Sequence, residues 1–220
     1  MKKICHMTSA HPSRDIRIFY KECVTLSRAG YKVVEIAHGK EFTEQGISVR
    51  SVGSEFTSRW KRMVFASRNV YHKALEVDAD VYHLHDPELL PYGLKLKKGG
   101  KHVIYDSHED VPRQILAKTW IPKLIRKWVS RWYERYEKSV ARQFDFVITA
   151  TDHIKEIFEE YGCKAESVKN YPLLDDIQCN NDNYLSRHPI LCYAGGITEQ
   201  RGITNILKAI EDLHVEVDLA

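Results

Sequence analysis

Short apolar runs typical of strands alternate with longer amphipathic runs along most of the chain. The strand-like runs lie at 2–8, 31–37, 47–52, 80–84, 102–105 and 146–149. Apolar residues recur at helical spacing at 16–28, 60–75, 87–96, 121–141 and 152–161. Strands that alternate with helices of this length are typical of a parallel sheet built from crossover units. We therefore predict an α/β fold, a Rossmann-like parallel sheet with helices on both faces.

The pattern changes near residue 170. A polar stretch at 175–188 contains three asparagines and no apolar periodicity. We interpret 1–170 as the first domain and 171–188 as an interdomain linker. The remaining residues, 189–220, read as strand, helix and strand, the first βαβ part of a second domain. Two strands and one helix bury no core of their own, so we expect this second α/β domain to be incomplete.

Composition and charge narrow the class of protein. The 220 residues include 33 Lys and Arg against 30 Asp and Glu, too small a surplus for a general nucleic-acid binder. No apolar run approaches the length of a membrane-spanning helix, and the first residues are too polar for a signal peptide, so we predict a cytoplasmic protein. The five cysteines form no Cys-x-x-Cys pair, which argues against a disulfide framework or a cysteine zinc site.

The densest polar cluster, His83 to Glu88, follows the strand at 80–84. Ligands of open parallel sheets bind at the carboxyl ends of the strands, so His85 and Asp86 are candidate site residues. His83 and His85 point to the same side of a strand, as a metal-binding pair does, and Asp106 and His108 could complete such a site. The alternatives are a metal-dependent hydrolase that uses these four residues, and a core His83 beside a solvated His85.

Two further strand-end loops carry polar groups. The loop at 9–17 contains Arg14 and Asp15, which either face a ligand or, in the case of Asp15, cap the following helix. The segment at 105–110 contains Asp106, His108 and Glu109, which suit the binding of sugar hydroxyls or the capping of a helix.

A strand-to-helix loop near the end of the chain contains Gly195, Gly196 and Arg201. Glycines allow the backbone to approach a phosphate closely, and an arginine can pair with its charge. A plain turn is the alternative. The chain contains neither Gly-x-Gly-x-x-Gly nor a P-loop, so the sequence supports no dehydrogenase or P-loop nucleotidase.

The helix expected at 121–142 is strongly amphipathic. Its basic residues outnumber its acidic ones by seven to two. One interpretation is a helix that packs its apolar face on the sheet with a solvated basic back; the other is a contact with anionic lipid headgroups. The apolar face is expected to comprise Ile121, Leu124, Ile125, Trp128, Val129, Trp132, Tyr136 and Val140.

With these segments in this order, the chain resembles the amino-terminal half of a group 1 (family 4) glycosyltransferase of the GT-B fold. The resemblance covers nearly the whole chain and rests on 10–19, 29–33, 83–90, 104–109, 168–172, 193–196 and 201–203. It implies an acceptor-binding first domain, a second domain for a nucleotide-sugar, and hexosyl transfer with retention to a glycan or lipid-linked acceptor. Cell-surface polysaccharide or lipopolysaccharide synthesis at the inner face of the cytoplasmic membrane is the implied setting.

The resemblance also assigns roles to residues. It implies that His85 and Asp86 are catalytic, and that Arg201, with Gly195 and Gly196, binds the donor diphosphate. Many members have an additional arginine where Gly196 stands. The same resemblance places Asp106, His108 and Glu109 near the acceptor, to which we add Arg14 and Asp15. We expect no metal and no cofactor besides the nucleotide-sugar substrate, and no nucleic-acid partner.

The family's paired glutamates, which grip the donor, lie beyond residue 220. We therefore expect this chain to be truncated and inactive or nearly so alone, with a separately encoded carboxyl-terminal half as one explanation. A non-catalytic sugar- or lipid-binding remnant is a further alternative. The sequence does not identify the sugar, the nucleotide, the acceptor or the oligomeric state.

Overall fold

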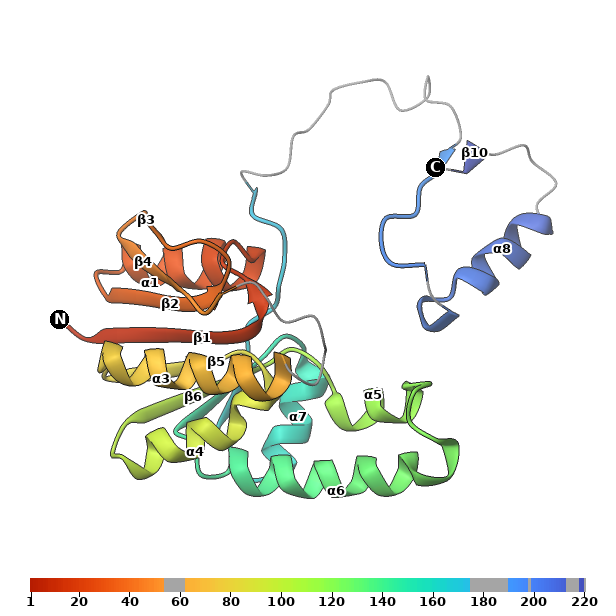
Figure 1. The fold of residues 1–220 in the computed structure, drawn as a ribbon. Coiled ribbons are helices and arrows are strands. Elements are labelled where there is room, and N and C mark those ends of the chain that lie inside the picture. The colour runs from red at the N-terminus through yellow and green to blue at the C-terminus, as the bar shows by residue number, and fades with distance from the viewer. Residues whose placement is uncertain (54–61, 175–189, 198, 213–217, 220) are drawn as a thin grey trace. The chain divides into compact units, whose positions relative to one another are not determined.

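The computed structural model describes residues 1–53, 62–174, 190–197, 199–212 and 218–219 (Figure 1). The chain divides into two compact units, Met1–Tyr171 and Pro172–Ala220. Most of the expected linker, the start of the helix expected at 60–75 and part of the last strand expected within 189–220 lie outside the described residues. None of the described helices is long and apolar enough to cross a membrane.

The first unit is built on one eight-stranded sheet. Its strands run in the order β3-β4-β2-β1-β5-β6-β7-β8, and every neighbouring pair is parallel except β3 and β4. The strands are β1 (Lys3–Pro12), β2 (Lys32–His38), β3 (Phe42–Glu44), β4 (Ile47–Ser51), β5 (Val81–Leu84), β6 (His102–Ser107), β7 (Phe146–Thr149) and β8 (Ala165–Ser167). The predicted Rossmann-like α/β sheet is therefore confirmed, with one antiparallel edge strand.

Helices cover both faces of this sheet. They are η1 (Ile16–Cys23), α1 (Val24–Arg28), η2 (Arg62–Ala66), α3 (Ser67–Val77), η3 (Pro87–Leu89), α4 (Leu90–Lys98), α5 (Val111–Ala117), α6 (Lys123–Ala141) and α7 (Asp152–Glu160). Residues of η1 and α1 pack on β2 and β4 in one buried cluster, whereas α3, α4, α6 and α7 contribute to a larger cluster with β1, β5, β6 and β7. The sheet thus has a core on each side.

The order of the strands reverses direction at β1. β1 pairs with β2 on one side and with β5 on the other, so the chain fills one half of the sheet and then the other. His6 of β1 lies in register with Glu35 of β2 and with His83 of β5. Because residues in register in neighbouring strands share a face of the sheet, three polar side chains form a row across this switch point.

The prediction for the helix at 121–142 is wrong in part. α6 buries Ser130, Glu137, Val140 and Ala141, whereas Leu124, Trp128 and Trp132 are 96%, 69% and 55% exposed. At about 100° per residue, the exposed apolar row lies on the side of the helix opposite to the buried one. The buried side of α6 contacts α5 and α4. Val129 and Tyr133 of α6 pack there on the buried residues of α5.

The second unit, described by itself, contains β9 (Ile190–Leu191), η6 (Glu199–Arg201), α8 (Ile203–Glu211) and β10 (Asp218–Leu219). β9 and β10 form a parallel pair, as expected for a βαβ unit. None of its residues whose burial is described is buried.

Candidate active site

The candidate site lies at the carboxyl ends of β1, β5 and β6, beside the switch point of the sheet. Parallel strands end at the same edge of a sheet, so the loops after these three strands meet there. The loop after β5 supplies His85 and Asp86, and β6 supplies Asp106, with His108 and Glu109 following it. The structure thus brings together five of the residues that the sequence analysis singled out.

Asp86 holds the end of β1 in place. Its Oδ2 accepts hydrogen bonds from Thr8 Oγ1 at 2.7 Å, from Ser9 N at 2.6 Å and from Ala10 N at 3.2 Å. The carboxylate is 3% exposed, and its Oδ1 lies 3.5 Å from Nε2 of His11. Charge-assisted hydrogen bonds of this kind are stronger than neutral ones, so Asp86 fixes the position of His11 relative to β5.

Asp106 is the centre of a buried ion pair. Arg17 of η1 donates from Nε to Oδ2 at 2.8 Å and from Nη2 to Oδ1 at 2.9 Å. Nδ1 of His85 lies 3.2 Å from the same Oδ2. Arg17 also donates from Nη1 to the carbonyl oxygen of Val168 at 2.9 Å. Asp106 is fully buried and its oxygens are engaged by the protein.

These contacts shift the ionisation of both partners. Burial by itself raises the pKa of Asp106, but hydrogen bonds with His85 and Arg17 outweigh it and hold that pKa well below its usual range. Burial lowers the pKa of His85, yet the hydrogen bond with Asp106 and the charge of Glu22 raise it above its ordinary value. Asp106 is therefore a carboxylate at neutral pH, and Nδ1 of His85 carries the proton that binds it.

The groups of this edge that solvent reaches are His11, His108 and Glu109. A cavity of about 20 Å³, room for one water molecule, is lined by side chains that include His85, Asp106, His108 and Glu109. The rings of His11 and His108 meet edge to face with their centroids 5.4 Å apart. Burial lowers the pKa of His108, whereas the hydrogen bond with Asp15 raises that of His11.

The loop residues Arg14 and Asp15 have different surroundings. Asp15 caps η1, because its Oδ1 accepts from Arg17 N at 2.8 Å and from Ile18 N at 3.0 Å, while its Oδ2 lies 3.3 Å from Nδ1 of His11. The hydrogen bond with His11 lowers the pKa of Asp15 to about 2. Arg14 pairs with Glu44 of β3 at 2.7 Å and is half exposed. The structure therefore joins Asp15, but not Arg14, to the group at the strand ends.

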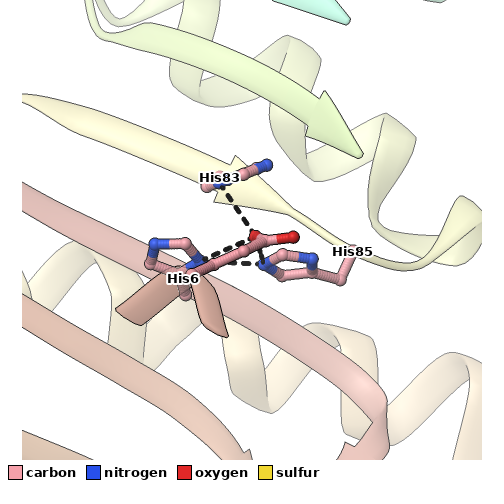
Figure 2. Close-up of side chains that lie close together, drawn as sticks. His6, His83 and His85 are labelled. Atoms are coloured by element: carbon pink, nitrogen blue, oxygen red, sulfur yellow. Dashed lines mark hydrogen bonds and ion pairs between the residues drawn. The ribbon is translucent and has the colours of Figure 1, made fainter. Parts of the chain in front are cut away.

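A second group of ionisable side chains lies behind His85, inside the fold. His6, Glu22, His83 and His85 each place one nitrogen or oxygen within 4.8 Å of the others (Figure 2). Nδ1 of His6 lies 2.9 Å from Nε2 of His85. Burial lowers the pKa of His6, lowers that of His83 to about 3, and raises that of Glu22 to about 8.

This second group corrects the metal set considered from the sequence. His83 and His85 do lie together, but Asp106 binds the far side of the His85 ring, and within the described residues the group is completed by His6 and Glu22. The sequence analysis missed Arg17 and Glu22 as site residues. Arg17 and Glu22 lie five positions apart in one helix, and Ile18, Phe19 and Cys23 of that helix are buried. The available signal was the presence of two charged residues among these apolar ones.

In the second unit, the loop after β9 brings Gly195 and Arg201 together. Gly195 has a φ of +151°, and a Cβ atom there would lie 2.8 Å from Nη1 of Arg201. A glycine is therefore needed for the guanidinium to rest against the backbone. Tyr193 Oη donates to the carbonyl oxygen of Gly196 at 2.9 Å.

Comparisons with known proteins give the family from a family model and the fold from solved structures. A family model described as Glycosyltransferase Family 4 matches residues 17–170. No curated protein matches the sequence. Sucrose-phosphate synthase (tll1590) from Thermosynechococcus elongatus is similar in structure, with a TM-score of 0.69, 14% identity, and coverage of 100% of this chain and 61% of that one.

Two further solved structures have the same fold. Anabaena Alr3699/HepE in complex with UDP and glucose has a TM-score of 0.66 at 11% identity, and the match covers 100% of this chain and 60% of that one. The lipopolysaccharide outer core galactosyltransferase WaaB in its apo form has a TM-score of 0.54 at 13% identity, with 99% and 59% covered. The chain thus spans about 60% of the length of these structures.

Proposed function

The chain belongs to Glycosyltransferase Family 4, and on that premise we propose that it takes part in hexosyl transfer from a nucleotide-sugar to a glycan or lipid-linked acceptor, with retention of the anomeric configuration. The family match over 17–170, which includes Arg17, His85 and Asp106, is the observation that carries this proposal. The similar fold of a protein solved with UDP and glucose, and of a lipopolysaccharide galactosyltransferase, supports the substrate class and cell-surface polysaccharide synthesis as the pathway.

The acceptor binds at the strand ends of the first unit in this proposal. His11, His108 and Glu109 offer ring nitrogens and a carboxylate at the part of this edge that solvent reaches, and such groups bind sugar hydroxyls. Asp15 orients His11 through Nδ1, and Asp86 lies near its Nε2. An imidazole held between two carboxylates is well placed to exchange a proton with a hydroxyl.

His85 and Asp86 act in this proposal as positioning residues. His85 is 1% exposed, with Asp106 at one ring nitrogen and His6 at the other, while Asp86 binds the backbone of β1. They contribute to transfer by holding His11 and the loop after β6 in position. This differs from the direct catalytic role that the family resemblance suggests for them.

The donor diphosphate binds at the loop of the second unit in this proposal. The close approach of Arg201 to Gly195 leaves an arginine beside exposed backbone, which suits a phosphate group.

The exposed side of α6 supports contact with an anionic membrane. Leu124, Trp128 and Trp132 form an exposed apolar row, and Lys123, Lys127, Arg131 and Arg135 form an exposed basic row beside it. Tryptophan at the headgroup level and basic side chains toward anionic lipid are the features of an interfacial helix. On this proposal, the protein lies in the cytoplasm at the inner face of the membrane.

Donor binding and transfer test the enzymatic part. UDP, GDP and their hexose conjugates are titrated while the melting temperature is followed, and a ligand at about 100 times its Kd should stabilise the protein by about 2.7 kcal/mol. Arg201→Gln should abolish the shift, whereas Lys208→Gln, an exposed cation on α8, should retain it. Product anomers from a panel of glycan and lipid-linked acceptors are assigned by NMR. A wild-type protein that no nucleotide stabilises would overturn the diphosphate site, and an inverted product would overturn retention.

Vesicle sedimentation tests the membrane part. The protein should bind vesicles that contain phosphatidylglycerol more tightly than neutral phosphatidylcholine vesicles, and added salt should weaken the binding. The double variant Trp128→Ala, Trp132→Ala should lose most of it. Leu75→Ala, which removes an exposed apolar residue from α3, should not. Equal binding to both kinds of vesicle at low salt would contradict this part alone.

A further inference from the structure

Three imidazoles and one carboxylate converge inside the first unit, at the switch point of the sheet. His6 comes from β1, His83 from β5 and His85 from the residue after β5 (Figure 2). Glu22 comes from the last turn of η1. The ring centroids lie 4.5 to 5.2 Å apart. We propose that these four side chains bind one divalent transition-metal ion, zinc in the first place.

The spacing of the candidate ligand atoms fits a tetrahedral zinc ion. Zinc–nitrogen bonds of about 2.0–2.1 Å place the ligands of a tetrahedron roughly 3.4 Å apart. Oε2 of Glu22 lies 3.9 Å from Nδ1 of His6, 3.8 Å from Nδ1 of His83 and 3.8 Å from Nε2 of His85. The distance between Nδ1 of His6 and Nε2 of His85 is 2.9 Å. The four measured separations fall on both sides of the ideal, so shifts of a few tenths of an ångström in most of them would close the site.

The protein itself leaves these polar groups poorly satisfied. His6 and His83 are buried, and within the described residues Nε2 of each has no hydrogen-bond partner. Neither oxygen of Glu22 accepts a hydrogen bond there either. Buried polar groups without partners cost about 1–3 kcal/mol each. A cation bound by Oε2 of Glu22 would offset this cost at the carboxylate. In His6 and His83 the candidate ligand atom is Nδ1, so Nε2 of each ring would carry the proton and stays without a partner within the described residues.

The surroundings of His85 are those of a metal-binding histidine. Its Nδ1 binds Asp106, so Nε2 faces the cluster with its lone pair. A carboxylate behind a metal-bound histidine fixes the tautomer and the orientation of the ring. Arg17 holds Asp106 with two hydrogen bonds and lies 3.1 Å from Oε1 of Glu22, which leaves Oε2 for the ion.

The buried charges also balance with a divalent ion in place. Glu35, in register with His6, is fully buried, and within the described residues neither of its oxygens has a hydrogen-bond partner. Ionised together, Glu22, Glu35 and Asp106 carry three negative charges, which equals the charge of one divalent ion plus Arg17. Glu22 and Asp106 lie in contact with Arg17 and the histidines, so a buried ion there would be paired with them.

Four protein ligands leave no open coordination position, which is the arrangement of a structural zinc site. The ion would tie β1, β5 and η1 together behind the acceptor-binding edge. This inference revises the expectation from the sequence that the chain binds no metal. It does not depend on sugar transfer, since a purely structural ion would bind whether or not the protein is a transferase.

Metal content and thermal stability test the proposal. The protein is stripped with a chelator, loaded with Zn²⁺, freed of excess metal by gel filtration and subjected to elemental analysis. We expect one zinc per chain and a higher melting temperature in the loaded protein. Co²⁺ in the same site should show the intense visible bands of tetrahedral coordination, which an octahedral surface site does not give.

Variants locate the ion. Glu22→Gln keeps the shape of the side chain, and His83→Phe fills the same space with an apolar ring; each should lower zinc affinity at least about tenfold. His153→Gln, which removes a largely exposed histidine on α7, should bind zinc as the wild type does. Wild-type protein that retains no zinc, or octahedral Co²⁺ bands, would overturn the proposal even if a variant failed to fold. Unchanged affinity in both variants would overturn it as well.

Discussion

The buried pair of Arg17 and Asp106 should be worth far more to stability than the exposed ion pairs of this protein. The side chains are 9% and 0% exposed, and the two hydrogen bonds between them are 2.8 and 2.9 Å long. Asp106→Asn keeps the shape of the side chain but leaves a buried guanidinium without its main counter-charge. Removing one partner of a buried pair costs about 3–5 kcal/mol.

The expected loss can be measured by urea denaturation and by thermal melting. For a protein of this size, about 2–4 °C of melting temperature corresponds to each kcal/mol, so the variant should melt roughly 6–20 °C lower. The measurement is made with excess chelator, so that bound metal contributes nothing to the difference. Glu22 still lies close to Arg17 in this variant and offers a second negative charge, so we expect a loss of stability near the lower end of the range.

Arg14→Met is the matched control. Arg14 also pairs with a carboxylate, that of Glu44 at 2.7 Å, but its side chain is 53% exposed. Exposed pairs contribute about 0–1 kcal/mol, so this variant should melt close to the wild type. If Asp106→Asn loses no more stability than Arg14→Met, burial does not amplify this interaction and the reasoning is refuted.

Three further predictions concern other parts of the first unit. Burial raises the pKa of Glu137 to about 8, so the folded protein holds a proton that the unfolded chain releases near pH 4.5. This group alone should lower stability by up to about 1.4 kcal/mol per pH unit between these values, and Glu137→Gln should reduce the slope of stability against pH by that amount in urea denaturation. Gly93→Ala places a Cβ atom 2.5 Å from Leu84 Cδ1 and 2.8 Å from Phe144 Cζ. This substitution should lower the free energy of unfolding by about 1–3 kcal/mol, and a more stable variant would show that the two side chains move aside freely. Asp15→Ala removes the cap of η1 and should cost about 0.5–2 kcal/mol in the same assay, whereas Asp15→Asn should restore most of it.

The sequence predicted the fold well where its apolar pattern is long. The helices α4 and α7 and the buried strands β2 and β5 each match an expected run within a few residues. β3, β8 and α5 were not predicted, because three-residue strands and a seven-residue helix are too short for a periodic pattern to stand out.

The side of a helix that is buried is harder to predict than the helix itself. The apolar row of α6 was expected to face the protein, but the structure packs Ser130 and Glu137 inward and leaves Trp128 exposed. Periodicity identifies two sides and does not say which one meets the rest of the fold. An apolar side meant for another partner gives the same pattern as one meant for the core.

The site could be predicted only in its strand-end part. Asp86 and Asp106 each come just after an expected strand, and the rule that parallel strands end at one edge was enough to bring them together. Arg17 and Asp106 are 89 positions apart, and His6 and His85 are 79 apart. No local pattern encodes such pairs; they follow from the order of strands in the sheet, which places β1 beside β5.

The contact between Arg17 and Val168 joins residues 151 positions apart. Lys21, one turn farther along η1, donates to Asn170 Oδ1 and to the carbonyl oxygen of Tyr171. During synthesis at about 5–20 residues per second, these partners of Arg17 and Lys21 therefore emerge roughly 8–30 s after η1 itself. Arg17 lacks Asp106 for the first part of this interval and lacks Val168 until its end. A nascent chain should therefore remain accessible to chaperones and proteases until nearly all of the first unit has left the ribosome.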